Sequence, residues 1–441
     1  MTGPLRILTF GNALAALAIV TGVALVVFRS QHLDETSAGA DRAPLVLLEL
    51  QTKLLAGMAR FDRIRALSEI EQLKGFESSP AGRRAVAALQ AYLLSSPDRP
   101  AALRQLPLPD AREPLDTLAA RAISEPSTLT PGDRATLLTE MGWFGRLLLA
   151  SSDAEIDRQV ESSSLKAMAI AGLASFLIFF AFLTGIVLLF FALIRRQQGL
   201  LPFRLEPSPE RSHLYFQAFA IYLWGMILFS TLALLLVGKD SPLNLISSAC
   251  SIVLSAALGI AYPRFRGVGI AEWRSDLGLH RGRGFFREVA AGIAAYLALL
   301  PLLAIGLGLT LVLQKLGTAS GETPSPISHP LYGLMPDASP GKLALLFLVA
   351  AVVGPFIEEM MFRGALYGAL RSFAGRGLSL LLMSFIFAAL HPQGVFAIPG
   401  LMAIAMSFGM MREWRSSLVA GAVMHGLHNG ALLLGILLLL S

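Results

Sequence analysis

Residues 167–194 read AMAIAGLASFLIFFAFLTGIVLLFFALI and contain no charged side chain. An apolar run of roughly 20 residues is long enough to cross the hydrocarbon core of a bilayer as an α-helix. This stretch therefore predicts a membrane-spanning helix, and it decides the fold class of the chain.

Further apolar runs recur on both sides of this stretch. Hydrophobic residues make up 54% of the chain and charged residues only 15%, whereas soluble domains average about 25% charged residues. We expect an all-α, polytopic membrane helix bundle with about nine spans. They are predicted at residues 7–28, 167–194, 214–237, 243–262, 288–314, 343–362, 377–391, 394–411 and 417–440.

The first run favours an uncleaved membrane anchor, residues 1–28, over a cleavable signal peptide. It is long, and no clear small-x-small cleavage site precedes the charged segment QHLDE.

Arginine gathers in the loops after the second, fourth and eighth predicted spans, and the positive-inside rule places such loops in the cytoplasm. We therefore expect a multi-pass protein of the cell (inner) membrane, with a cytoplasmic N-terminus and an external C-terminus. The net charge of +6 then reflects loop asymmetry next to anionic lipid, and no nucleic acid partner is expected. The lone Cys250 lies inside a predicted span, which excludes a disulfide framework. The arginines of these three loops are Arg195, Arg196, Arg204, Arg211, Arg264, Arg266, Arg274, Arg281, Arg283, Arg287, Arg412 and Arg415.

Residues 29–165 interrupt the membrane pattern. Acidic and basic residues are nearly balanced there, and stretches such as LVLLELQTKLLAGMARFDRIRALSEIEQL have helical periodicity. We expect a soluble, helical, extracytoplasmic domain. It contains no cysteine pair, phosphate loop or obvious catalytic cluster, which leaves a ligand-binding, partner-docking or spacer role open.

Ionisable residues inside predicted spans are costly and usually face a bundle interior or a wet cavity. The sixth span ends in GPFIEEMMFRGALYG, residues 354–368. Glu359 and Arg363 are four residues apart, with the acid first, so that the arginine can neutralise the carboxylate. Glu358 has apolar neighbours and no such partner, which suits a general base. Pro355 removes a backbone hydrogen bond one turn earlier and is expected to kink the helix.

The histidines supply the second half of the predicted site. His425 and Asn429 are four residues apart on one helix face, beside glycines that permit close helix approach. His391 directly precedes Pro392 and is expected to cap its span. A carboxylate, a histidine that holds water and a His/Asn pair that stabilises an oxyanion are the groups required for amide hydrolysis by activated water.

These residues form motifs that resemble a known family. EEMMFR (358–363), FAALH (387–391) and HGLHN (425–429) resemble the EExxxR, FxxxH and HxxxN motifs of the CPBP family, the CAAX proteases and bacteriocin-processing enzymes. The resemblance covers residues 240–441, and residues 166–239 are expected to be membrane helices that link to this core.

The resemblance implies an intramembrane endopeptidase that cleaves a membrane or membrane-associated peptide or protein with glutamate-activated water. The implied catalytic residues are Glu358, Glu359, Arg363, His391, His425 and Asn429. Eukaryotic members of the family cleave prenylated CAAX tails, whereas bacterial members usually have other substrates.

Two alternatives stay open beside this hypothesis. One is a zinc-dependent protease with Glu358, His391 and His425 as ligands, although no cofactor is the favoured expectation because the HExxH spacing is absent. The other is a non-enzymatic transporter or scaffold. Counting 1.5 Å per residue also places His391 nearer the outer face than Glu358 and His425.

Overall fold

The computed structural model describes residues 10–32, 42–94, 98–108, 111–238, 241, 243–320, 329–336 and 338–440. All regular structure in these ranges is helical, so the predicted all-α class is confirmed. The chain divides into two compact units. The membrane unit comprises Met1–Ala38, Ile178–Ser320 and Ala338–Leu433, and the helical unit comprises Gly39–Leu177, Gly321–Asp337 and Leu434–Ser441.

Eight helices of the described part are long and apolar enough to cross a membrane. The stretch between α12 and α16 is interrupted by π-helical turns, and it counts as one span, Pro340–Arg371. The start of the first predicted span, residues 7–9, lies outside the described residues. The other candidate spans are α1 (Phe10–His32), α8 (Ala154–Gln197), α9 (Ser212–Val237), α10 (Asn244–Phe265), α12 (Phe285–Ala319), α17 (Ile398–Arg415) with the turn before it, and α18 (Val419–Leu440).

The seventh predicted span is the one that differs. Helix α16 covers only Arg376–Ala389, and 14 residues at 1.5 Å each reach about 21 Å, short of a hydrocarbon core of about 30 Å. This helix is therefore shorter than the hydrocarbon core, and it stands as a shorter apolar helix beside the eight candidate spans of the described residues, against about nine spans expected.

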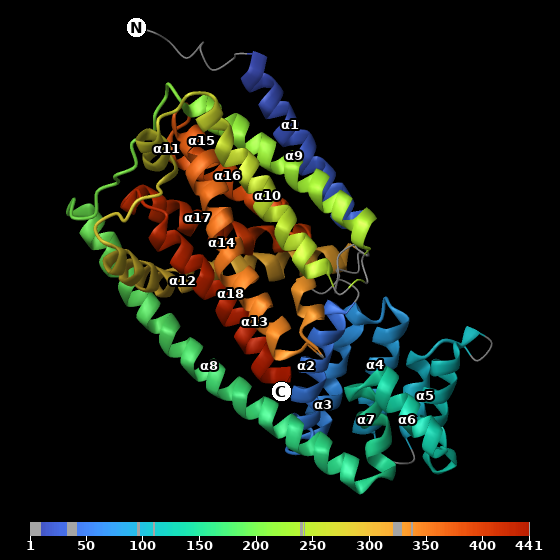
Figure 1. Ribbon diagram of the computed structural model, residues 1–441. Coiled ribbons are helices and arrows are strands. Elements are labelled where there is room, and N and C mark those ends of the chain that lie inside the picture. Colours follow the sequence, from blue (N-terminus) through green and yellow to red (C-terminus); the bar gives the residue numbers. More distant parts are fainter. Residues whose placement is uncertain are drawn as a thin grey trace. The chain divides into compact units, whose positions relative to one another are not determined.

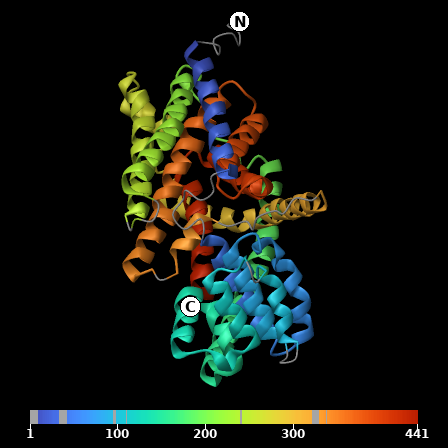
Figure 2. The same cartoon turned by 90° about the vertical axis from the view of Figure 1, so that its right-hand side faces the viewer.

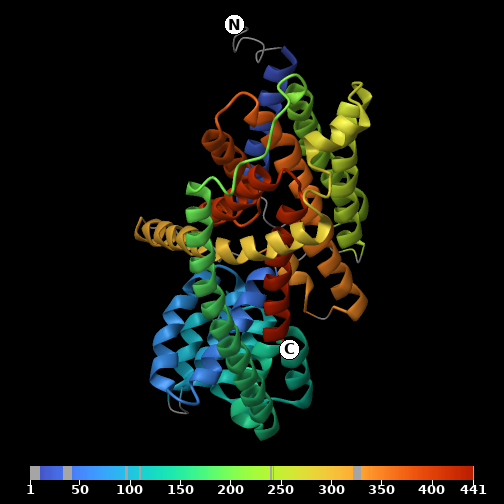
Figure 3. The same cartoon turned by 90° about the vertical axis from the view of Figure 1, so that its left-hand side faces the viewer.

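The membrane unit is a bundle in which distant parts of the sequence lie side by side. Helix α9 packs against α1 and α10, and α17 packs against α12 and α16 (Figure 1). Figures 2 and 3 show α12 crossing the direction of α9 and α10 at a steep angle. The short elements of this unit are α11 (Ile270–Leu277), α13 (Pro340–Leu348), α14 (Gly354–Glu358) and α15 (Tyr367–Arg371).

The helical unit has a hydrophobic core of its own. Trp143 is buried in it, and its indole nitrogen donates to the hydroxyl of Thr52 at 3.0 Å. The main helices are α2 (Ala43–Met58), α3 (Arg63–Ser68), α4 (Pro80–Leu93), α5 (Pro114–Ser124), α6 (Pro131–Met141) and α7 (Trp143–Leu149). Helix α8 begins at Ala154, so the predicted second span is the later part of a longer helix.

One pocket of the helical unit, of about 800 Å³, has Arg60, Arg63 and Arg99 in its lining. The guanidinium of Arg99 is buried and donates to the carbonyls of Ala122 and Leu148, near the ends of α5 and α7. Arg99 thereby satisfies carbonyls that a helix end leaves unpaired, which gives it a structural role.

Candidate active site

The helix that carries the two glutamates has wide turns on either side of Pro355. Residues Val349–Val353 and Glu359–Leu366 are π-helical, and Gly354–Glu358 between them is α-helical. Single π-helical turns inside α-helices are found frequently at functional sites. The predicted disturbance at Pro355 thus takes the form of π-helical turns.

Glu359 and Arg363 form the ion pair that their spacing predicts. Arg363 Nη1 lies 3.1 Å from Glu359 Oε1, and both side chains are buried. Arg363 Nη2 also donates to the carbonyl of Ala405 in α17 at 3.1 Å. The guanidinium contacts the rings of Phe387 and Phe408, 4.6 and 5.2 Å from their centroids. This arrangement fixes the Glu359 carboxylate firmly in place.

His425 of α18 contacts both glutamates. Its Nδ1 lies 3.3 Å from Glu359 Oε1, and its Nε2 lies 3.6 Å from Glu358 Oε2. The second distance fits an ion pair but is too long for a hydrogen bond. The sequence motifs gave no indication that one histidine would join the two carboxylates.

Glu358 is the more open of the two acids. Its side chain is 29% exposed, against 1% for Glu359 and 4% for His425. Within the described residues its buried Oε2 has no hydrogen-bond partner. Such an unsatisfied polar atom in a native site requires an explanation, and an ordered water or a catalytic role is among the usual ones.

His391 lies just beyond the end of α16, near both parts of the site. Its ring packs on Phe387 at 4.2 Å between centroids, and the ring of His425 lies 6.0 Å from the same phenyl group. His391 Nδ1 is 2.7 Å from the carbonyl oxygen of Phe387, which leaves Nε2 as the nitrogen able to accept a proton. His391 therefore lies near His425, although residue counting placed it closer to the outer face.

Asn429 lies one turn beyond His425 in α18 and faces the helix that carries the two glutamates. Its Nδ2 donates to the carbonyl of Ala350 at 2.9 Å. His428, which lies outside the three motifs, faces elsewhere and packs against the ring of Tyr296 at 6.2 Å.

The glycines of α18 allow this close approach. A Cβ atom on Gly421 would lie 2.7 Å from Glu359 Oε2, and one on Gly426 would lie 2.5 Å from the carbonyl oxygen of Ala351. Both distances are shorter than real Cβ contacts. The predicted role of these residues in helix packing is confirmed for Gly421 and Gly426.

The zinc ligand set suggested by the sequence is not assembled in the described part of the chain. No group of three or more His, Cys, Asp or Glu side chains gathers there in a way that could hold a metal ion. Glu358 and His425 are near each other, and Nδ1 of His391 faces a backbone carbonyl, which leaves its Nε2 as the nitrogen open to a ligand. The expectation that the site works without zinc is not tested by this finding and stays a prediction.

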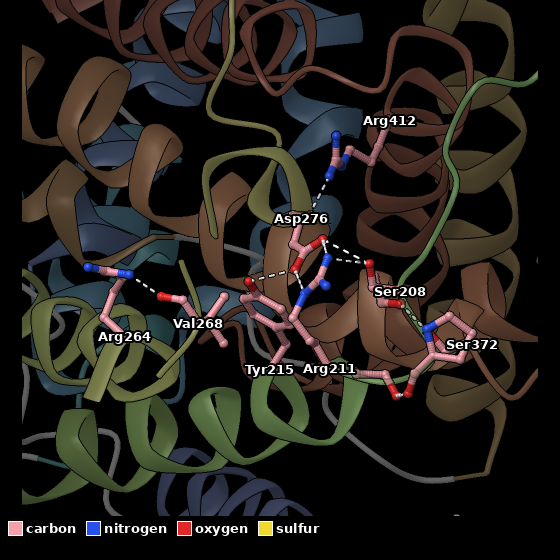
Figure 4. A network of polar contacts seen from close by, with 11 residues as sticks. Ser208, Arg211, Tyr215, Arg264, Val268, Asp276, Ser372 and Arg412 are labelled. Carbon is pink, nitrogen blue, oxygen red and sulfur yellow. Dashed lines mark hydrogen bonds and ion pairs between the residues drawn. The ribbon is translucent and has the colours of Figure 1, made fainter. Parts of the chain in front are cut away.

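A second polar network joins the arginine-bearing loops of the membrane unit around Asp276, an acid that the motifs did not single out (Figure 4). Asp276 of α11 accepts hydrogen bonds from Ser208, Arg211 and Tyr215, and its carbonyl accepts one from Arg412 at 2.8 Å. The hydrogen bond to Asp276 raises the pKa of Arg211. This network holds loops together and contains none of the motif residues.

Two fully buried acids, Glu413 and Glu288, also hold arginines. Glu413 pairs with Arg371 and Arg376, and Glu288 pairs with Arg415. Two arginines counted in the sequence as a topology signal, Arg211 and Arg415, are therefore also structural partners of carboxylates.

Fold and site together define an all-α integral membrane protein with a buried carboxylate, arginine and histidine cluster. Residues 340–431 match the family model described as type II CAAX prenyl endopeptidase Rce1-like. The match is consistent with the resemblance to the CPBP family, and the matched segment contains all the candidate site residues. The match indicates a CAAX-type protease, which is a hydrolase, and it covers less than half of the chain. No curated protein and no solved structure matched the chain.

Proposed function

We propose that the protein is an intramembrane endopeptidase that cleaves a membrane or membrane-associated peptide by attack of a water activated by Glu358. The observation that carries this proposal is the difference between the two acids: Glu359 is buried and paired with Arg363, whereas Glu358 is partly open. Only a carboxylate with an open side can meet both a water molecule and a peptide bond.

In the proposed reaction, a water bound beside Glu358 attacks the peptide carbonyl carbon while the carboxylate takes a proton from that water. His391 accepts a hydrogen bond from the same water through Nε2, because its Nδ1 is directed at the carbonyl of Phe387. The carbon–nitrogen bond then breaks, and Glu358 returns the proton to the leaving amine.

His425 is the best-placed group for stabilising the oxyanion. Its Nδ1 is held by the fixed carboxylate of Glu359, which leaves Nε2 on the side of Glu358. When Nε2 carries a proton, it can donate to the negative oxygen that develops in the transition state. Glu359 and Arg363 then serve as positioning residues. Glu359 contacts His425, and Arg363 holds Glu359 in place.

The substrate is proposed as a peptide or protein that reaches the site from the bilayer. The matched family description names CAAX prenyl peptides, so a farnesylated CAAX peptide is a suitable first probe. The helical unit, residues 39–177 with two short additions, is the part of the chain where we propose a substrate or partner docks.

Comparative membrane proteomics tests the function in cells. Membranes with the wild-type protein should contain cleaved C-termini whose uncut precursors accumulate in Glu358→Gln cells. Glu206→Gln, a change at an exposed glutamate, is the matched control and should resemble wild type. A change in transport of a solute with no uncut precursor would instead favour a transporter.

A further inference from the structure

The carbonyl of Ala350 is left without a backbone donor by the helix turn that contains it. Gly354 donates to the carbonyl of Val349, five residues back. In the same register the next donor would be residue 355, and its acceptor would be Ala350. Residue 355 is a proline and has no N–H.

A side chain from another helix fills this gap. Asn429 Nδ2 donates to the Ala350 carbonyl at 2.9 Å. Inside a bilayer, backbone groups freed by a proline must be satisfied by neighbouring helices or by side chains, because no bulk water is present. The next carbonyl, that of Ala351, lies directly against Gly426 of the same helix. Helix α18 therefore presents its backbone and one amide to the opened turn.

We propose that Asn429 is a positioning residue whose amide replaces the N–H that Pro355 lacks. By holding the wide turn at Val349–Val353, it sets the direction in which the following glutamates point. One extra residue in a turn rotates all later side chains by about 100° around the helix axis. Loss of the wide turn would therefore turn Glu358 and Glu359 away from His425.

This inference deepens the proposed function and rests on it for its activity readout alone. It departs from the sequence hypothesis, in which Asn429 and His425 together stabilise the oxyanion. The two roles differ in what else they require: a positioning amide depends on Pro355, whereas an oxyanion donor does not.

A double-mutant cycle of Asn429→Ala and Pro355→Ala separates these roles, with the Tm and kcat of the purified protein as readouts. Asn429→Ala alone should lower Tm and reduce kcat about tenfold, about 1.4 kcal/mol, which is within the range of interhelical hydrogen bonds. In the Pro355→Ala background, Asn429→Ala should change Tm and kcat much less, because the alanine at 355 supplies the missing backbone N–H. His428→Ala, one residue away on α18, is the control and should be additive with Pro355→Ala.

Other results would overturn the proposal. A loss of kcat by about 100-fold to 1000-fold, with no change in Tm and the same size in both backgrounds, would identify Asn429 as an oxyanion donor. If the Pro355→Ala protein does not accumulate, Asn429→Leu provides a second test, because leucine keeps the side-chain volume but has no hydrogen-bond donor. An unchanged Tm for Asn429→Leu would refute the positioning role. The Tm results hold even if the protein proves not to be a protease, whereas loss of cleavage in Glu358→Gln tests the protease function by itself.

Discussion

Glu358 and Glu359 are adjacent in the sequence, yet their surroundings differ in every respect that matters for chemistry. Glu359 is enclosed by Arg363 and His425, while Glu358 keeps an open side. Removing the partner of the buried Glu359 is expected to destabilise the fold, because an unpaired buried charge is strongly unfavourable. Glu358 has no such partner to lose. The two residues therefore require separate tests.

The pair of Glu359 and Arg363 should behave as one unit. Arg363→Gln leaves the buried Glu359 carboxylate without its arginine, and Glu359→Gln leaves the buried Arg363 guanidinium without its carboxylate, so each single change should be severe. The double variant should be milder than the sum, with a coupling of about 0.5–3 kcal/mol in the free energy of unfolding. Thermal unfolding of the four proteins measures this, and strict additivity would show that the contact contributes nothing.

Chelation addresses the metal question at the same residues. Because no ligand set here has the spacing of a known zinc motif, we expect the purified protein to stay active in strong chelator. Elemental analysis should find no stoichiometric zinc. Activity that disappears on chelation and returns with added zinc would refute the metal-independent mechanism.

The sequence predicted the contact of Glu359 with Arg363, because four residues along a helix bring two side chains together. It could not predict that His425 joins the two glutamates, since this contact depends on how α18 packs against a helix more than 50 residues earlier. The acids Asp276, Glu288 and Glu413 were missed for a similar reason: each finds its arginine only in the folded bundle.

At the scale of elements, the site depends on two helices whose backbones nearly touch. Gly421 and Gly426 of α18 face Glu359 and the Ala351 carbonyl without room for a methyl group. Small residues at such contacts are typical of membrane helix pairs.

Gly421→Ala should therefore damage the site. Its Cβ would lie 2.7 Å from Glu359 Oε2, and relief of that overlap requires shifts that cost about 1–3 kcal/mol. Gly435→Ala on the same helix is the control, because its Cβ would meet nothing within 4 Å. Tm and cleavage should fall for Gly421→Ala alone, and equal effects of the two changes would contradict the close contact.

Element boundaries were the less predictable part of the fold. Apolar length located the long spans. The seventh run continues past the helix end at Ala389 into a loop, because hydropathy does not distinguish the end of a helix from an apolar loop. Proline predicted a disturbance at residue 355, whereas the π-helical turns around it depend on contacts from α18.

At the scale of the whole molecule, the arginine-bearing loops are joined to one another. Arg211 binds Asp276, Arg412 donates to the carbonyl of Asp276, and Arg415 binds Glu288. Loops that meet in this way lie on the same side of a membrane, as the arginine count requires. That this side is the cytoplasm stays a prediction.

Cysteine labelling tests the predicted topology. In a Cys250→Ser background, Ser127→Cys in the helical unit should react with an impermeant thiol reagent added outside intact cells. Ser275→Cys, at an exposed position of α11, should react only after the membrane is opened. The reverse pattern would show that the helical unit is cytoplasmic.

The measurement closest to the central claim is the turnover number of purified protein in lipid vesicles on the peptide whose precursor accumulates in Glu358→Gln cells. Wild type and Glu206→Gln should cleave it equally. Glu358→Gln should keep the wild-type Tm and lose kcat by about 100-fold to 10,000-fold, as expected when a general base is removed. A Glu358→Gln protein that still cleaves within a few-fold of wild type would contradict the assignment of Glu358 as the base.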